Sequence, residues 1–104
     1  MMGFFRNLLG AAPDSNIEQL LKKGATIVDV RTEREYISGH VRGSMNIPLD
    51  KLQKNISKLK KNKPIITCCA SGIRSATAKK ILMNSGFTDV HNGGSWTNVQ
   101  RRAN

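Results

Sequence analysis

Residues 65–83, IITCCASGIRSATAKKILM, decide the fold. An apolar, β-branched run ends in two adjacent cysteines, a short loop with a central glycine (Gly72) follows, and a helix-forming run begins near Ser75. This order predicts a buried strand over 65–68, a tight loop and a helix over 75–84. Such a loop directs backbone N–H groups and the start of a helix at the Cys69 sulfur, and both stabilise an anion there.

The two cysteines of the chain, Cys68 and Cys69, are adjacent. Neighbouring residues of a strand point to opposite faces, so we do not expect an ordinary structural disulfide between them. Their use therefore indicates a reducing compartment or a working thiol. We expect Cys69, at the end of the strand, to be the reactive thiol and Cys68 to lie in the core. A small buried residue is the structural alternative for Cys69, and a vicinal disulfide is the redox alternative.

Composition and charge are those of a single globular domain. The chain has 104 residues, of which 38% are hydrophobic and 23% are charged, and this suffices for a core without metals or disulfides. The formal net charge of +10 attracts anions from solution. No aromatic residue interleaves with the lysines of residues 51–63, which favours a solvated surface over specific nucleic-acid binding. No metal motif is present, and we expect neither a metal nor a cofactor.

The first thirteen residues differ from the rest of the chain. They are apolar, but Arg6 and Asn7 interrupt them, so they match neither a signal peptide nor a transmembrane segment. We expect a flexible or amphipathic N-terminal segment over 1–13, a domain over 14–104, and a cytoplasmic protein.

Strand and helix patterns alternate along the rest of the chain. Two capping boxes, Ser15–Glu18 and Thr32–Glu35, predict the starts of two helices. We further expect Asp50 to cap a helix over 49–59, Gly93 and Gly94 to form a turn, and Ser95 to cap a final helix. The expected elements are helix 16–23, strand 26–30, helix 33–37, strand 45–47, helix 49–59, strand 65–68, helix 75–84, strand 89–91 and a helix from 96. This alternation predicts a parallel α/β sheet with helices on both faces and a ligand site at the carboxyl ends of the strands, where Cys69 lies.

The sequence also suggests roles for two further polar residues, Asp29 and His40. Asp29 lies inside an apolar run, and a buried carboxylate needs a partner, so we expect it to bond nearby backbone or Arg31. His40 lies in a loop bounded by glycines, where it either fixes the loop by a hydrogen bond, which we favour, or acts as an acid or base.

Separated motifs between about residues 15 and 96 resemble the single-domain rhodanese (thiosulfate sulfurtransferase) family. They are Asp29-Val30-Arg31, Glu35-Tyr36, Gly39-His40-Val41-Arg42-Gly43-Ser44-Met45-Asn46-Ile47-Pro48, Cys69-Ala70-Ser71-Gly72-Ile73-Arg74-Ser75, Gly86-Phe87, and Gly93-Gly94 with Trp96. The resemblance implies a three-layer α/β/α rhodanese-like domain around a central parallel sheet of four or five strands. Two departures stand out: Ala70 replaces a residue that is often polar in the family, and residues 4–9 are a poor match to the usual first edge strand.

The resemblance also implies a reaction. Cys69 would take a sulfane sulfur from thiosulfate or a similar donor as a persulfide and pass it to cyanide, a thiol or an acceptor protein. The loop that would bind the substrate comprises Ala70, Ser71, Gly72, Ile73, Arg74 and Ser75, with Asp29, Arg31 and His40 in support. Arg74 either faces the substrate anion or anchors the loop.

Two alternatives stay open. A cysteine phosphatase or arsenate reductase uses a similar loop with five residues between cysteine and arginine, whereas here four residues separate Cys69 from Arg74. The smaller cradle favours a sulfur over a tetrahedral phosphate. A non-catalytic or sulfur-relay rhodanese-like module is the other alternative.

Overall fold

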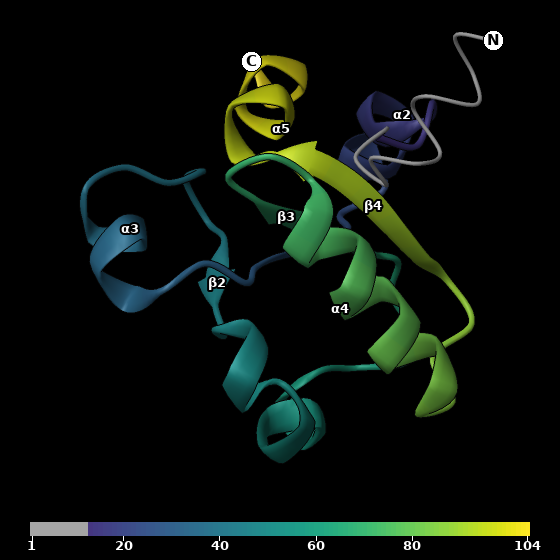
Figure 1. The fold of residues 1–104 in the computed structure, drawn as a ribbon. Helices are drawn as coiled ribbons and strands as arrows, with labels where there is room; N and C mark the ends of the chain where they lie inside the picture. The colour runs from purple at the N-terminus through teal and green to yellow at the C-terminus, as the bar shows by residue number, and fades with distance from the viewer. Residues whose placement is uncertain (1–12) are drawn as a thin grey trace, which may run out of the picture.

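The computed structural model describes residues 13–104, which form a four-stranded parallel sheet with helices on both faces (Figure 1). The strands are β1 (Thr26–Asp29), β2 (Met45–Asn46), β3 (Ile65–Cys69) and β4 (Val90–Ser95), in the order β2-β1-β3-β4. The predicted α/β class is confirmed, with four strands in the described part of the chain. Because all four run in the same direction, their carboxyl ends share one edge of the sheet, and Cys69 is the last residue of β3.

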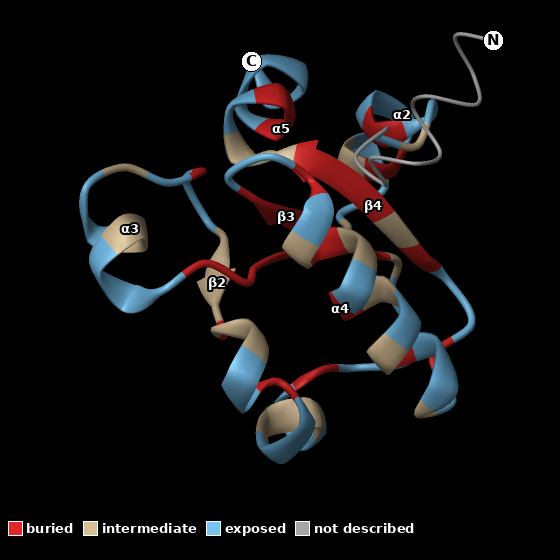
Figure 2. Ribbon diagram, viewed as in Figure 1, coloured by how far each residue is buried: buried red, intermediate tan, exposed pale blue. Residues whose placement is uncertain are grey.

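The sheet divides the core into two layers, and helices cover each of them. On one face the sheet packs against α4 (Ile73–Asn84) and the two 3-10 helices η1 (Leu49–Lys51) and η2 (Gln53–Lys58); on the other it packs against α2 (Ile17–Lys22) and α5 (Trp96–Ala103). Cys69 belongs to the first layer and Cys68 to the second, as strand alternation requires. Figure 2 shows β3 buried along its length, because both of its faces are covered.

Two helix starts follow the sequence closely. In α3 (Glu33–Ile37), the Thr32 side chain accepts from the Glu35 N–H, and the Glu35 carboxylate accepts from the Thr32 N–H, which completes the predicted capping box. In α5, the Ser95 hydroxyl accepts from the Asn98 N–H, as predicted. Both caps depend only on residues within one turn, and this is why local sequence was sufficient to predict them.

The prediction of a capping box at Ser15 was wrong. Helix α2 begins at Ile17 after Asn16, and among the described residues no side chain caps it. The preceding residue, Asp14, is instead tied to β4: its N–H donates to the Asn92 carbonyl at 2.8 Å and its carboxylate accepts from the Asn92 N–H at 2.9 Å. This attachment fixes the path of the chain into α2 and leaves Ser15 in a turn.

The predicted amphipathic helix over 49–59 is broken into η1 and η2. Its capping by Asp50 was also wrong, because Pro48 precedes η1 and, within the described chain, no side chain caps it. Leu52 and Leu59 are buried as the spacing required, but the backbone bonds are of the i→i+3 kind. The Asn55 side chain donates to the Lys51 carbonyl at 2.8 Å, and a side chain that takes up a backbone carbonyl in this way competes with the α-helical ladder.

The elements around the cysteine are longer than predicted. Strand β3 includes Cys69, and α4 begins at Ile73, so the connecting loop shrinks to residues 70–72. Strand β4 extends through Gly93 and Gly94, which were predicted to form a turn. The register changes there, since Thr67 pairs with Asn92 but Cys69 pairs with Ser95, so β4 carries one extra residue. Gly94, with φ of +79°, supplies the backbone conformation that this irregularity needs.

The expectations about the N-terminal segment, including the poor first strand over 4–9, lie outside the described residues. Within residues 13–104, no helix combines the length and apolar character needed to cross a bilayer.

Candidate active site

The Cys69 sulfur lies where β3 ends and α4 begins. It accepts hydrogen bonds from the backbone N–H of Gly72 at 2.9 Å and of Ser75 at 3.4 Å, and it lies 3.5 Å from the Ser75 hydroxyl oxygen. Gly72 precedes the first turn of α4 with φ of +101°, a left-handed conformation that favours glycine. The short loop therefore turns its own N–H groups and the start of a twelve-residue helix toward one sulfur.

These contacts favour the thiolate of Cys69. Burial of the sulfur raises its pKa, but the hydrogen bonds with the Ser75 hydroxyl and with the N–H groups of Ser75, Gly72 and Ser71 outweigh burial, so the pKa lies below the ordinary value of a cysteine. On the opposite face of β3, burial and the nearby charge of Asp29 raise the pKa of Cys68 far above its usual range. The surroundings of Cys69 thus favour a thiolate, whereas those of Cys68 oppose one.

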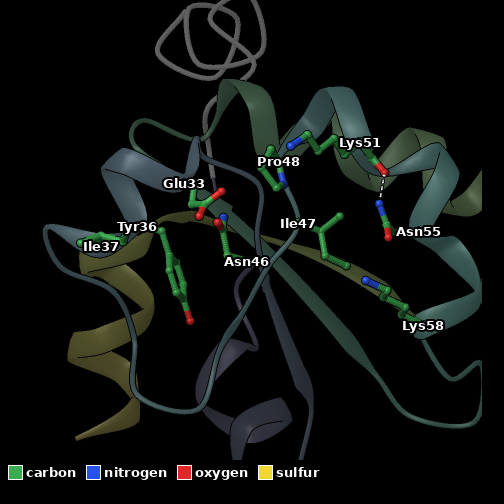
Figure 3. Close-up of a pocket in the computed structure, with 9 residues that line it drawn as sticks. All are labelled: Glu33, Tyr36, Ile37, Asn46, Ile47, Pro48, Lys51, Asn55 and Lys58. Atoms are coloured by element: carbon green, nitrogen blue, oxygen red, sulfur yellow. Dashed lines mark hydrogen bonds between the residues drawn. The ribbon is translucent and has the colours of Figure 1, made fainter.

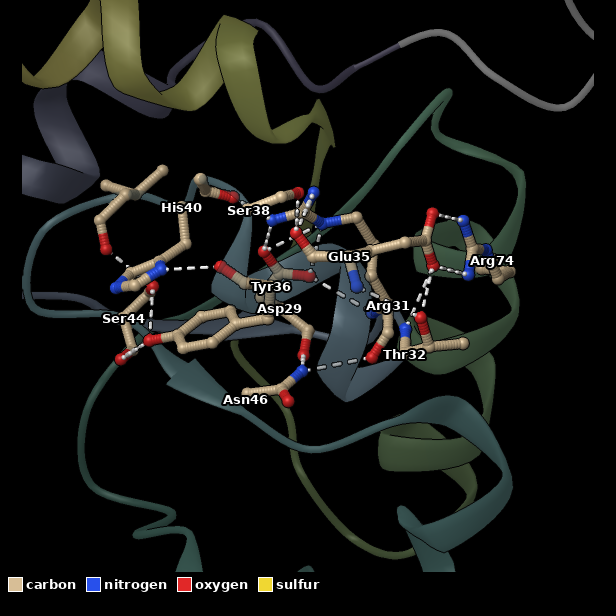
Figure 4. A network of polar contacts seen from close by, with 12 residues as sticks. Asp29, Arg31, Thr32, Glu35, Tyr36, Ser38, His40, Ser44, Asn46 and Arg74 are labelled. Atoms are coloured by element: carbon tan, nitrogen blue, oxygen red, sulfur yellow. Dashed lines mark hydrogen bonds and ion pairs between the residues drawn. The ribbon is translucent and has the colours of Figure 1, made fainter.

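Arg74 lies in the first turn of α4 and is held by Glu35 of α3. Its two terminal nitrogens donate to the two carboxylate oxygens at 2.8 and 3.0 Å, as Figure 4 shows. The hydrogen bond with Arg74 is the largest cause of a fall in the Glu35 pKa to about 2. Of the two roles open to Arg74, the geometry matches an anchor between α3 and the cysteine loop.

Asp29 and Arg31 form a buried ion pair beside this anchor. The Asp29 carboxylate accepts from Arg31 Nη2 at 2.8 Å and from the Arg31 backbone N–H at 3.0 Å, and both side chains are buried. Arg31 also donates to the Gly39 carbonyl at 2.7 Å, and its guanidinium carbon lies 4.8 Å from the centre of the Trp96 ring. The predicted partner of Asp29 is confirmed, and this pair connects β1, the loop after α3, and α5.

His40 contacts Tyr36 of α3. Its Nδ1 donates to the Tyr36 carbonyl at 2.7 Å, and its ring stacks on the Tyr36 ring with centroids 3.8 Å apart. The Tyr36 hydroxyl in turn donates to the Ser44 carbonyl at 2.6 Å. These contacts correspond to the loop-fixing role and not to an acid or base beside Cys69.

Some residues of the cysteine loop are exposed and others are buried. Ala70, Ser71 and Ile73 are exposed, whereas Gly72, Ser75 and the Cys69 side chain itself are buried. A shallow hollow of about 280 Å³ adjoins the loop at Arg74, between Thr32 and Pro48. A larger hollow of about 480 Å³ lies between α3 and the 46–58 segment (Figure 3). Cys69 lines neither hollow.

Two residues of this region were not singled out as site residues from sequence. Glu35 was expected as a capping residue and as part of a family motif, and nothing local indicates that it reaches Arg74, 39 positions away. Asn92 is buried in β4, and its side-chain oxygen accepts from the Ser75 hydroxyl at 2.6 Å. A polar residue directly before two glycines in a strand was the available signal for Asn92. Among residues 13–104, no cluster of three histidine, cysteine or acidic side chains could hold a metal ion.

Known proteins share this architecture and sequence. The family model described as rhodanese-like domain matches residues 14–101. The thiosulfate sulfurtransferase PspE of Escherichia coli is 35% identical over 74 residues, covering 69% of this chain and 71% of its own. The uncharacterized protein YqhL of Bacillus subtilis is 34% identical over 68 residues, covering 65% of this chain, which spans only 54% of that protein.

A solved structure agrees with these relatives. The structure described as a rhodanese with anions from E. coli is 34% identical, with a TM-score of 0.67 over 71% of this chain and 89% of its own. Relatives at this distance include thiosulfate sulfurtransferases, an uncharacterized protein and a protein described as a sulfur carrier. On the family match and the shared fold, the chain belongs to the rhodanese-like family.

Proposed function

We propose that the protein is a sulfurtransferase that carries a sulfane sulfur as a persulfide on Cys69. The observation that carries this proposal is the set of hydrogen bonds that converge on the Cys69 sulfur from Gly72 and Ser75. Related thiosulfate sulfurtransferases support the choice of substrate class. Donors that carry a transferable sulfur next to a negative charge, with thiosulfate as the simplest, match both the activated thiol and the net charge of +10.

In the first step, the Cys69 thiolate attacks the outer sulfur of thiosulfate. An S–S bond forms to Cys69, the S–S bond of thiosulfate breaks, and sulfite leaves with the bonding electron pair. The total negative charge is unchanged, because the enzyme persulfide keeps one charge and sulfite carries two. The N–H groups of the loop stabilise the thiolate before the attack and the persulfide after it.

In the second step, an acceptor such as cyanide or a thiolate attacks the outer sulfur of the persulfide. The new bond forms to the acceptor, and Cys69 departs as a thiolate, which regenerates the starting enzyme. A leaving thiolate is a better leaving group when its pKa is low. The hydrogen bonds of Gly72 and Ser75 therefore assist this step as well as the first.

Access to the sulfur requires motion of the loop. Cys69 is completely buried, whereas the next two residues, Ala70 and Ser71, are exposed. A donor reaches the sulfur when residues 70–72 shift outward, and the Arg74–Glu35 pair holds the following helical turn in place while they do. In this proposal Arg74 anchors the loop and does not bind the substrate directly.

The test is to incubate the protein with thiosulfate, remove the excess, and record its intact mass. A gain of about 32 Da, the mass of one sulfur atom, is expected, and cyanide should reverse it with release of thiocyanate. Cys69→Ser should abolish both signals. Its matched control, Cys68→Ser, should retain them, because Cys68 points into the opposite layer of the core.

Three results would contradict the proposal. The first is the absence of both adduct and thiocyanate in the folded protein. The second is hydrolysis of a phosphate ester in place of sulfur transfer, which would favour the phosphatase alternative. The third is an inactive Cys68→Ser variant with an active Cys69→Ser variant, which would show that the nucleophile is Cys68 and not Cys69.

A further inference from the structure

The Ser75 hydroxyl has more acceptors than hydrogens. Its oxygen lies 2.6 Å from Asn92 Oδ1, 3.0 Å from the Gly72 carbonyl oxygen and 3.5 Å from the Cys69 sulfur. A serine hydroxyl carries one hydrogen, so only one of these groups receives it at a time. The 2.6 Å distance identifies Asn92 as the acceptor in this structure, because it is the shortest of the three.

Whether this position of the Ser75 hydrogen is favourable depends on the charge of the Cys69 sulfur. While Asn92 holds the hydroxyl hydrogen, the Ser75 oxygen presents lone pairs to the sulfur and accepts from the Cys69 S–H. This one contact suits a neutral thiol, whereas the backbone N–H groups of Gly72 and Ser75 favour the thiolate. A thiolate has no hydrogen to give and can only accept, so the same arrangement would bring a lone pair against a negative charge.

The Asn92 side chain can lose the hydrogen bond from Ser75 and still keep hydrogen-bond partners. Asn92 is 5% exposed, and its Oδ1 also accepts from the Gly94 N–H at 2.9 Å. When the Ser75 hydroxyl turns away, Oδ1 keeps the Gly94 bond, and the amide Nδ2 still donates to the Gly72 carbonyl at 3.4 Å. A buried acceptor that keeps a partner in both states avoids the cost of an unpaired polar group.

We propose that Asn92 is a positioning residue of the Cys69 site. It accepts a hydrogen bond from the Ser75 hydroxyl while the sulfur is neutral and loses that bond when the sulfur becomes negative. On ionisation, the Cys69 proton leaves to solvent and the Ser75 hydroxyl rotates toward the sulfur, with no covalent bond of Ser75 broken. The inner sulfur becomes neutral again in the persulfide, and the hydrogen returns to Asn92. This inference rests on the proposed function for its place in the sulfur-transfer cycle.

Charged side chains from several elements also face this region. Those that form ion pairs around this part of the sheet are Asp14, Asp29, Arg31, Glu35, Arg74, Lys79, Asp89 and His91. Arg31 and Arg74 each bond a carboxylate, and Lys79 bonds Asp14. The imidazole of His91 is the group to control for, and His91→Gln removes it without touching the Ser75 hydroxyl.

The test measures the ionisation of Cys69 from the pH dependence of its alkylation by iodoacetamide, with the modified cysteine identified by mass mapping. In Asn92→Leu, the Ser75 hydroxyl loses its nearest acceptor, and of the two that remain, the Gly72 carbonyl and the sulfur, the thiolate is the stronger because it is charged. The midpoint should fall by about half a pH unit or more, which corresponds to one net hydrogen bond. The same shift should appear in the His91→Gln background.

Two further variants separate a positioning role of Asn92 from a general loss of folding stability. Asn98→Leu is the matched control, because Asn98 is also buried and its Nδ2 donates to the Gly93 carbonyl at 2.8 Å, away from the sulfur. It should lose stability without moving the alkylation midpoint. In the Ser75→Ala background, Asn92→Leu should have no further effect, because the hydroxyl through which it acts is gone. An unchanged or raised midpoint in Asn92→Leu overturns the proposal.

A measurement on the unaltered protein covers the case in which Asn92→Leu does not fold. The side-chain amide resonances of Asn92 should shift in nitrogen–proton correlation spectra with the same midpoint as Cys69, whereas those of Asn98 should not. Asn92 resonances that stay constant through this range overturn the proposal. Neither readout needs a sulfur donor, so failure here leaves the persulfide experiment untouched, and failure of that experiment leaves the ionisation result readable.

Discussion

Arg74 and Glu35, 39 positions apart, are joined by two parallel hydrogen bonds of 2.8 and 3.0 Å. The same Glu35 carboxylate accepts from the Thr32 N–H at 3.0 Å. One side chain thus closes the capping box of α3 and fixes the first turn of α4. Ser75 follows Arg74 directly, so this pair holds the turn of α4 whose Ser75 N–H donates to the Cys69 sulfur.

Replacing Glu35 by glutamine should destabilise the protein in a pH-dependent way. Both side chains of the pair are about one-third exposed, so screening limits the expected loss to about 0.5–1 kcal/mol near neutral pH. The Glu35 pKa falls from 4.5 to about 2 in the folded protein, so its contribution is present above pH 4.5 and is lost as the pH falls toward 2.

Urea denaturation at pH 7 and at pH 3 measures this difference. The gap between the unaltered protein and Glu35→Gln should narrow at pH 3. Glu33→Gln, on the exposed side of the same helix, is the control and should change stability little at either pH. A gap that stays constant across this range would show that the Arg74 pair does not stabilise the fold.

The two cysteines should differ sharply in reactivity. Hydrogen bonds to the Cys69 sulfur lower its pKa, whereas burial and the charge of Asp29 raise that of Cys68. In the native protein, iodoacetamide should modify Cys69 with a midpoint below that of an ordinary thiol and should leave Cys68 unmodified. After unfolding in urea both should react alike, with a midpoint of about 8.5. Peptide mass mapping at several pH values distinguishes the two, and native modification of Cys68 would contradict the assignment.

Neutralising Asp29 should be one of the most damaging single changes. Asp29→Asn leaves the buried Arg31 guanidinium without its counter-charge, and breaking a buried pair in this way costs about 3–5 kcal/mol. Chemical denaturation should show the loss directly. Asp50→Asn, an exposed aspartate in η1, is the matched change and should have little effect. Similar stabilities for the two variants would mean that the buried pair is dispensable.

Alanine substitutions at Gly93 and Gly43 should separate the loss of stability caused by a steric clash from that caused by backbone strain. A Cβ at Gly93 would lie 2.6 Å from Val99 Cγ2 and 2.7 Å from Ile66 Cγ2, so Gly93→Ala should cost about 3 kcal/mol. At Gly43, no described atom lies within 4 Å of such a Cβ, and only its φ of +85° opposes the change, at about 1 kcal/mol. Denaturation curves of both variants give the comparison, and an equal loss would refute close packing at Gly93.

The sequence by itself determined the features that depend on neighbours within a few residues. Alternating strand and helix patterns predicted the parallel sheet, and the capping residues Thr32 and Ser95 predicted two helix starts. Strand alternation assigned Cys68 and Cys69 to opposite faces. These predictions succeeded because backbone periodicity and helix capping are local properties.

Tertiary structure alone decided the features that join distant segments. The 49–59 pattern became two 3-10 helices, and the two glycines became part of β4, because each segment is constrained by what it packs against. Sequence indicated an activated cysteine but neither the Glu35 anchor of Arg74 nor the Asn92 bond to Ser75. Both contacts form only after folding brings their partners together at the carboxyl edge of the sheet. Local sequence therefore predicts which thiol is reactive, whereas the fold sets the positions of the groups that surround it.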